Sequence, residues 1–209
     1  MTSCKAFHEW ARTLTQYRFS FDRSGIPPNG IYLLFEKGER GHGGERIVRV
    51  GTHTGEGQLL SRLKQHFITP NKDRSIFRKN IGRALLSCDE DSFLADWELD
   101  LTSAAARARH KHRIDARKQE AVERKVSNYI QNNFSFAVIR VDGKEEWLRL
   151  ESRIISTVSL CLICKPSPNW LGNFSPREKI RKSGLWIVNE LYKKPLNGRD
   201  FTRLQKAML

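Results

Sequence analysis

Long apolar runs are missing from this 209-residue chain. The longest uncharged apolar stretch, IISTVSLCLIC at residues 154–164, is about half of the ~20 residues that a membrane helix needs. The N-terminal segment MTSCKAFHEWARTL meets Lys5, Glu9 and Arg12 before an apolar run can build, which argues against a secretory signal. We therefore expect a soluble, cytoplasmic protein without a membrane partner.

Acidic residues are also scarce, because 23 Asp and Glu stand against 37 Lys and Arg and leave a net charge of +14. A basic excess favours a polyanionic partner, since each neutralised phosphate releases condensed counterions. Nucleic acid is the first inference and an anionic membrane surface the second. Residues 104–126 carry eight Lys and Arg against three Asp and Glu, which predicts one basic helix. This helix is either a solvated surface or a nucleic-acid contact made by Arg107, Arg109, Lys111 and Arg113.

Cysteines are few as well: the chain has Cys4, Cys88, Cys161 and Cys164. A single CxxC without a second pair or a His-x-x-x-His partner is weak support for a zinc site or a disulfide framework. Cys161 and Cys164 fall at the end of an apolar helical pattern, so we interpret them as ordinary buried thiols in a reducing cytosol. A zinc-dependent structural domain is the alternative interpretation.

The hydrophobic periodicity predicts a small α/β fold of the α+β type. Period-2 runs indicate a central sheet of about three strands, and period-3.6 runs indicate helices that flank it. The strands are expected at 30–36, 46–51 and 134–141, and the helices at 4–19, 58–67, 74–86 and 144–163, followed by a helix after Pro176 that stops at Gly184. The loop GERGHGGE should join the first two strands as a hairpin.

One carboxylate lies on the wrong face of the helix expected at 144–163. The apolar stripe of that helix includes Trp147 and Ile154, and Glu151 falls inside it. An unpaired buried carboxylate costs several kcal/mol, so Glu151 should be protonated, paired with a basic residue or bound to a cation. A hard divalent cation such as Mg²⁺ suits the last case, because Mg²⁺ takes few protein carboxylates and completes its coordination with water and phosphate oxygens.

Arg62 and His66 lie four residues apart in the helix expected at 58–67, and therefore on one face of it. Arginine binds phosphate oxygens in a bidentate manner, and histidine can move a proton near neutral pH. The pair is either a phosphate site or two solvated residues. Tyr32, near the start of the strand GIYLLFEKG, raises a similar choice between filling a strand position and supplying a reactive hydroxyl.

The order of these features resembles the GIY-YIG nuclease domain, a family that includes restriction enzymes and homing endonucleases. Gly30-Ile31-Tyr32 matches the first half of the family name, Val50-Gly51 matches the end of the second half, and a helix with a central Glu follows later. The resemblance covers about residues 29–174. It implies a 1–28 helical extension, a 29–174 nuclease domain with a helical insertion at about 88–132, and a 175–209 helical tail.

The resemblance also implies a function and a set of site residues. The function is a metal-dependent endonuclease that cuts DNA, with RNA not excluded, one Mg²⁺ or Mn²⁺ ion per active site and a homodimer possible. The implied residues are Tyr32, Arg62, His66 and Asn169 for catalysis, with Asn173 as the alternative asparagine, and Glu151 as the metal ligand. The resemblance leaves open whether Tyr32 or His66 is the general base.

Two features depart from the family pattern. The second tyrosine is replaced by Arg49, which cannot act as a phenol and can contribute only positive charge, and the spacer between the two halves is long. The alternative function is therefore a nucleic-acid-binding module on the same fold that has lost its catalytic activity. The retained Glu151 favours the nuclease.

Overall fold

A computed structural model describes residues 3–110 and 112–206 and has one antiparallel sheet at its centre. The three expected strands are present, which confirms the α/β prediction, and a fourth short strand completes the sheet. Its members, in the spatial order β1-β4-β2-β3, are β1 (Gln16–Arg18), β4 (Phe134–Arg140), β2 (Gly30–Gly41) and β3 (Gly44–Gly51). The expectation of one helix over 4–19 was wrong, because α1 (Cys4–Ala11) ends early and the chain continues into β1.

The β2–β3 hairpin is longer than its glycine-rich sequence suggested. Its strands pair as far as Gly41 and Gly44, and only His42 and Gly43 form the turn. Both turn residues have positive φ, 53° and 79°, as in the two-residue hairpin turns whose twist matches that of the strands. The stretch expected to be a loop is therefore largely paired strand.

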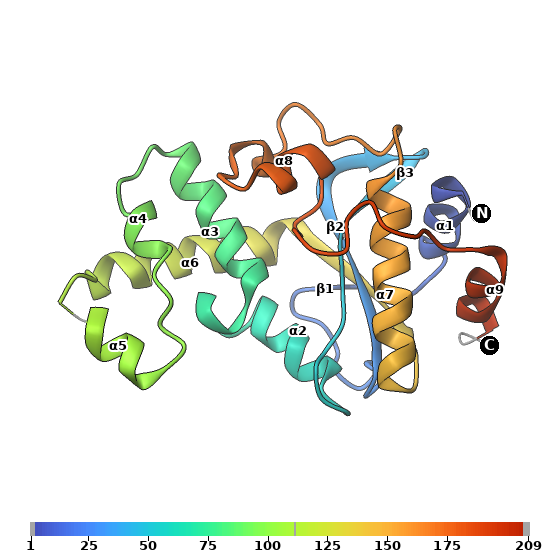
Figure 1. Cartoon of the computed structure of the whole chain (residues 1–209), viewed down its shortest axis with the longest axis horizontal. Coiled ribbons are helices and arrows are strands. Elements are labelled where there is room, and N and C mark those ends of the chain that lie inside the picture. Colours follow the sequence, from blue (N-terminus) through green and yellow to red (C-terminus); the bar gives the residue numbers. More distant parts are fainter. Residues whose placement is uncertain (1–2, 111, 207–209) are drawn as a thin grey trace.

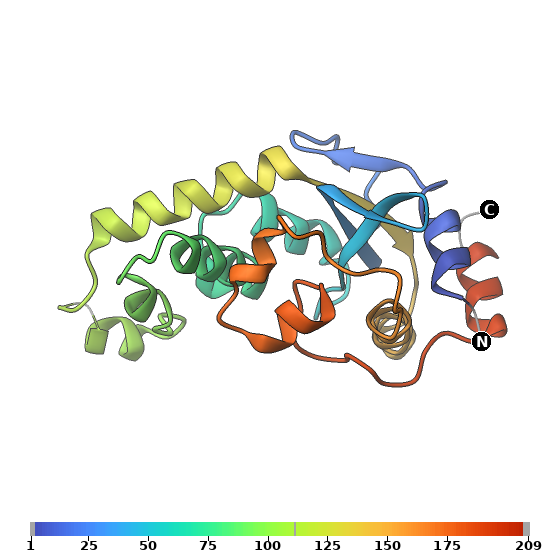
Figure 2. The same cartoon turned by 90° about the horizontal axis from the view of Figure 1, so that it is seen from above.

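Helices cover both faces of the sheet, in three layers (Figures 1 and 2). Successive side chains of a strand point to opposite faces, so Leu33 and Leu34 enter different cores. The Leu33 core contains α1, α7 (Lys144–Ser159) and α9 (Gly198–Lys206). The Leu34 core contains α2 (Leu59–Phe67), α3 (Ile76–Cys88) and α6 (Ala116–Asn133).

Helix α7 carries the predicted stripe but is shorter than expected. Trp147 and Ile154 are buried as predicted, whereas the helix stops at Ser159 and leaves Leu162 82% exposed in the following loop. Its N-cap position is taken by Gly143, and the neighbouring Asp142 carboxylate pairs with the Arg140 guanidinium.

The predicted basic helix over 104–126 is two helices. α5 (Ala104–His110) follows the short α4 (Leu94–Trp97), and α6 begins anew at Ala116. Asp115 causes the restart, because its carboxylate accepts hydrogen bonds from the backbone N–H groups of Arg117 and Lys118, as an N-cap residue does. α6 then runs directly into β4 and lies along one side of the molecule in Figure 2.

The chain after α7 returns to the sheet. It forms the 3-10 turn η2 (Leu171–Phe174) and α8 (Glu178–Ser183), which stops at Gly184 with φ of 69°, as predicted. Beyond that stop, the Trp186 N–H donates to the Val48 carbonyl of edge strand β3 at 2.7 Å. Within the described ranges, no helix combines the length and the apolar character needed to cross a bilayer. The expected domain boundaries at 28 and 174 stay a prediction.

Candidate active site

A cavity of about 290 Å³ lies beyond the end of edge strand β3, between α2 and α7. α2 and α7 cover opposite faces of the sheet, and both contribute side chains to this cavity. Arg62 enters it from α2, Glu151 from α7, and Thr52 from the loop that follows β3. The structure thus brings together two of the residues that the sequence predicted separately.

The Glu151 carboxylate is half-buried, and its pKa is perturbed accordingly. The pKa of Glu151 is raised from 4.5 to about 7, mainly by burial and to a smaller extent by the nearby Glu190 carboxylate. The charges of Arg49 and Arg62 and a backbone hydrogen bond from Thr52 act in the opposite direction and only partly compensate. A cation beside Glu151 would restore its ionised form near neutral pH.

Arg62 is held at the rim of the cavity by its own neighbours. Its Nη1 donates to Gln65 Oε1 and to the Arg74 carbonyl, both at 3.0 Å. These bonds restrict a long side chain that would otherwise sample many rotamers, so less entropy is lost when the guanidinium binds an anion.

Tyr32 and His66 form a buried hydrogen-bonded pair and do not line the cavity themselves. Tyr32 Oη lies 2.8 Å from His66 Nε2, and His66 Nδ1 lies 2.7 Å from Ser75 Oγ. Burial, followed by the charges of Arg62 and Arg49 among others, holds the pKa of His66 well below 6.5. The imidazole is therefore neutral at neutral pH, so Nε2 can accept the phenol proton when Nδ1–H donates to Ser75.

Gly51 explains why the two halves of the motif lie side by side. Tyr32 and Gly51 are directly opposite in the β2–β3 register, and a Cβ on Gly51 would lie 2.2 Å from Tyr32 Oη. Only glycine leaves room for the phenol at this position. Because Thr52 follows Gly51 and lines the cavity, the Tyr32 hydroxyl is placed next to the cavity wall.

Arg49 lies on Tyr32's face of the sheet because the pairing is regular from Tyr32–Gly51 to Leu34–Arg49, and a register shift follows. Leu34 pairs with Arg49 and Phe35 with Ile47, so Val48 is an extra residue of the kind found in β-bulges. The buried Arg49 guanidinium lies over the Phe77 ring at 5.4 Å from its centroid and donates to the Trp186 carbonyl. Its positive charge acts on both Glu151 and His66.

The two candidate asparagines lie outside the cavity lining. Asn169 is exposed in the loop between α7 and η2. Asn173 Nδ2 donates to the carbonyls of Ser167 and Pro168 at 2.9 and 3.0 Å, which is a local loop contact. The catalytic role of Asn169 stays a prediction.

Sequence reasoning missed Thr52 and Glu190. Thr52 directly follows the Val-Gly end of the motif, so the motif itself could have indicated it. Glu190 comes from the chain after α8, where its carboxylate accepts a hydrogen bond from Ser152 Oγ at 2.5 Å and pairs with Lys193 at 2.7 Å. No pattern in the sequence links Glu190 to Glu151.

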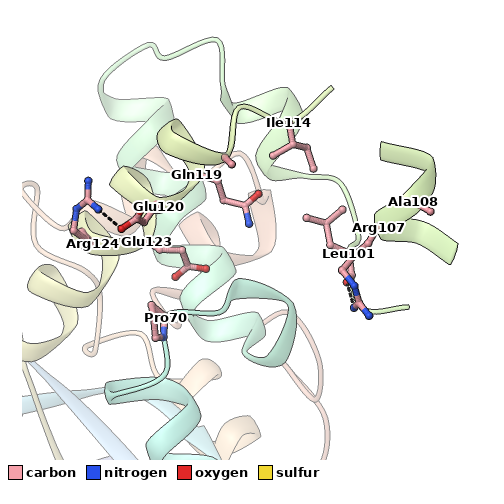
Figure 3. A pocket seen from close by; sticks show the side chains of 10 residues that line it. Pro70, Leu101, Arg107, Ala108, Ile114, Gln119, Glu120, Glu123 and Arg124 are labelled. Carbon is pink, nitrogen blue, oxygen red and sulfur yellow. Dashed lines mark hydrogen bonds and ion pairs between the residues drawn. The ribbon is translucent and has the colours of Figure 1, made fainter. Parts of the chain in front are cut away.

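The basic segment 104–126 is partly engaged in contacts within the protein. Arg107 Nη1 donates to the Leu101 and Thr102 carbonyls at 2.9 Å, beside an apolar cavity of about 610 Å³ (Figure 3). Arg113 pairs with Asp96 at 3.3 Å, Arg109 is exposed, and Lys111 lies outside the described residues.

Comparison with known proteins identifies the family of this chain. A family model of the GIY-YIG domain matches residues 6–207. No curated protein and no solved structure matches the chain. Members of the matched family are nucleases of the endonuclease type, and the matched range includes both halves of the motif, the Arg62 helix and the Glu151 helix. The chain therefore belongs to the GIY-YIG domain family.

Proposed function

We propose that the protein is a metal-dependent endonuclease that hydrolyses phosphodiester bonds in DNA. The observation that carries this proposal is the convergence of Arg62 and Glu151 on one cavity, with the buried Tyr32–His66 pair one helical turn from Arg62. These groups supply an anion site, a cation ligand and a proton acceptor, which are the three functions that phosphodiester hydrolysis needs.

The residues present fit a magnesium or manganese ion. Glu151 is a half-buried carboxylate whose raised pKa shows that nearby positive charge does not compensate its burial. Mg²⁺ is typically bound by one or two carboxylates and completes its coordination with waters and phosphate oxygens, so Glu151 would hold the ion. When bound, the ion neutralises charge on the scissile phosphate and the leaving oxygen.

Arg62 and Tyr32 have separate tasks in this proposal. Arg62 binds a non-bridging phosphate oxygen at the cavity rim and stabilises the charge that builds up in the transition state. Tyr32 Oη first passes its proton to His66 Nε2, 2.8 Å away, and the resulting phenolate accepts a proton from the attacking water. The buried Arg49 charge favours the phenolate that this transfer creates. Tyr32 is then the base and His66 the relay.

The partner is nucleic acid because the chain carries a net charge of +14 and belongs to a nuclease family. DNA is the proposed substrate, with RNA as a second arm of the assay. A single site cuts one strand, so double-strand cleavage requires a homodimer or two successive events. The alternative is a nucleic-acid-binding module that has lost its catalytic activity. The replacement of the second tyrosine by Arg49 favours this alternative.

The deciding experiment incubates purified protein with supercoiled plasmid and with structured RNA, in Mg²⁺ and in EDTA. The nuclease predicts Mg²⁺-dependent cleavage that Glu151→Gln lowers by orders of magnitude without weakening DNA binding, because the ion acts mainly on the transition state. Glu145→Gln, an exposed change in the first turn of the same helix, is the control and should cut normally. Tight DNA binding by the wild type without any cleavage would favour the binding module.

A further inference from the structure

Four side chains of types that can bind a metal meet beside the turn of the β2–β3 hairpin. Cys4 and His8 come from α1, His42 from the turn of the β2–β3 hairpin, and Cys164 from the loop after α7. Their ligand atoms all lie within 4.8 Å of one another, and Cys4, His8 and Cys164 are buried. Figures 1 and 2 both place α1 beside the hairpin turn.

Two distances within this cluster are close to those expected around one tetrahedral ion. Cys4 Sγ lies 3.7 Å from Cys164 Sγ, which lies 3.8 Å from His8 Nε2. Zinc bonds of 2.3 Å to sulfur and 2.0–2.1 Å to nitrogen at tetrahedral angles place two sulfurs about 3.8 Å apart and a sulfur about 3.5 Å from a nitrogen. The sulfur separation also excludes a disulfide in this conformation, because that bond is about 2.05 Å long.

We propose that Cys4, His8, His42 and Cys164 bind one structural zinc ion. Thiolate and imidazole ligands select zinc over the oxygen-seeking Mg²⁺, and four protein ligands close the coordination sphere to substrate. The site is separate from Glu151, since the eight residues of β3 place the hairpin turn roughly 25 Å from the Thr52 end. Zinc binding displaces one proton from each of the two thiols.

The burial pattern of the Cys161–Cys164 loop supports the site. Leu162 and Ile163 are 82% and 71% exposed, whereas the Cys164 side chain between them and the core is 2% exposed. Exposing two large apolar side chains to water is unfavourable for the free energy of folding. A metal bond to the inward-facing Cys164 thiol would stabilise the loop in this orientation. Cys161 Sγ, 3.4 Å from His42 Nε2, is placed to orient the His42 ring.

His8 already has a bond that a zinc ligand would use. His8 Nδ1 lies 2.9 Å from the Cys4 carbonyl, and a backbone acceptor on the second ring nitrogen is the usual support of a metal-bound histidine. Zinc on Nε2 preserves this bond and replaces only the bond from the Ile47 N–H, which is 3.1 Å long. The metal would link α1, the hairpin and the loop after α7.

The test is a Co²⁺ titration of metal-free wild-type protein in a non-thiol reductant, since tetrahedral cobalt bound to thiolates gives strong visible and charge-transfer bands. We expect these bands to saturate at one Co²⁺ per chain and to disappear when Zn²⁺ is added. Zinc should also raise the midpoint of thermal unfolding, because it binds the folded state. Because this titration uses the wild-type protein, its result does not depend on whether a variant folds.

Variants then identify the ligands. Cys4→Ser and Cys164→Ser should lose the bands, whereas Cys88→Ser, a change of an exposed thiol at the end of α3, should retain them. Glu151→Gln should also retain them, which separates this proposal from that of the nuclease. Two results would overturn the zinc site: wild-type protein without thiolate bands, or Cys4→Ser protein whose bands and stoichiometry equal those of the wild type.

Discussion

Replacing Glu151 with glutamine should stabilise the protein at alkaline pH when no divalent cation is present. Burial raises the pKa of this carboxyl from 4.5 to about 7, so the folded state holds a proton that the unfolded chain has already released. The resulting stability is fully present below about pH 4.5 and is lost as the pH rises through about 7. The wild type should therefore become less stable over this range, and glutamine, which does not titrate, removes that loss.

The magnitude follows from the same pKa values. A rise from 4.5 to about 7 corresponds to about 3.4 kcal/mol at 1.36 kcal/mol for each pH unit. Glu151 is only half-buried and faces a cavity, so solvent screening reduces this figure. We expect the variant to gain about 1–3 kcal/mol over the wild type at pH 8 and almost nothing at pH 4.5.

Urea unfolding in EDTA at several pH values between 4.5 and 8.5 measures this gain. The difference between variant and wild type cancels the titration of every other group, and Glu145→Gln is the matched control, because Glu145 is exposed on the same helix. Adding Mg²⁺ at pH 8 should stabilise the wild type alone, since the variant lacks the ligand. A difference in unfolding free energy that is constant with pH would refute the reasoning, because it would mean that Glu151 titrates normally.

Three further outcomes are expected. Tyr32→Phe should lower the cleavage rate. It should also lower the free energy of unfolding in urea by about 1–2 kcal/mol, because it leaves buried His66 without its hydrogen-bond partner at 2.8 Å. An unchanged free energy of unfolding would contradict the Tyr32–His66 hydrogen bond. Glu123→Ala should lower the free energy of unfolding by about 3–5 kcal/mol in the same assay, since it leaves the buried Arg78 charge unpaired. A loss under about 1 kcal/mol would show that the Arg78–Glu123 ion pair is not desolvated. The slope of log DNA affinity against log salt concentration should be shallower in Arg109→Glu, by about 0.9 for each phosphate that the variant no longer neutralises. An unchanged slope would mean that α5 is a solvated surface.

Local patterns predicted much of the fold because they act over short distances. The alternation in GIYLLFEKG predicted β2, and the stop at Gly184 needed only one residue that tolerates positive φ. The same local reasoning failed over 104–126, where the cap at Asp115 divides a continuous basic pattern. It also missed β1, because three residues are too few to show a period, and only pairing with β4 makes them a strand.

The candidate site divides in the same way. The sequence by itself determined that Glu151 lies within an apolar stripe and that Arg62 and His66 share a helix face, because helical spacing alone decides both. Only the tertiary structure decided that His66 faces Tyr32 and away from solvent, while Arg62 reaches the cavity. It also decided that the charge of Arg49 reaches Glu151.

The cysteines show this limit most clearly. The sequence showed one CxxC without a second pair or a His-x-x-x-His partner, and its position at the end of an apolar pattern indicated ordinary buried thiols. Folding brings Cys4 and His8, one helical turn apart, to His42 and Cys164. Ligands from three distant segments have no common spacing in the chain. Their meeting depends on the hairpin and on the helices packed against the sheet, and only the tertiary structure contains that information.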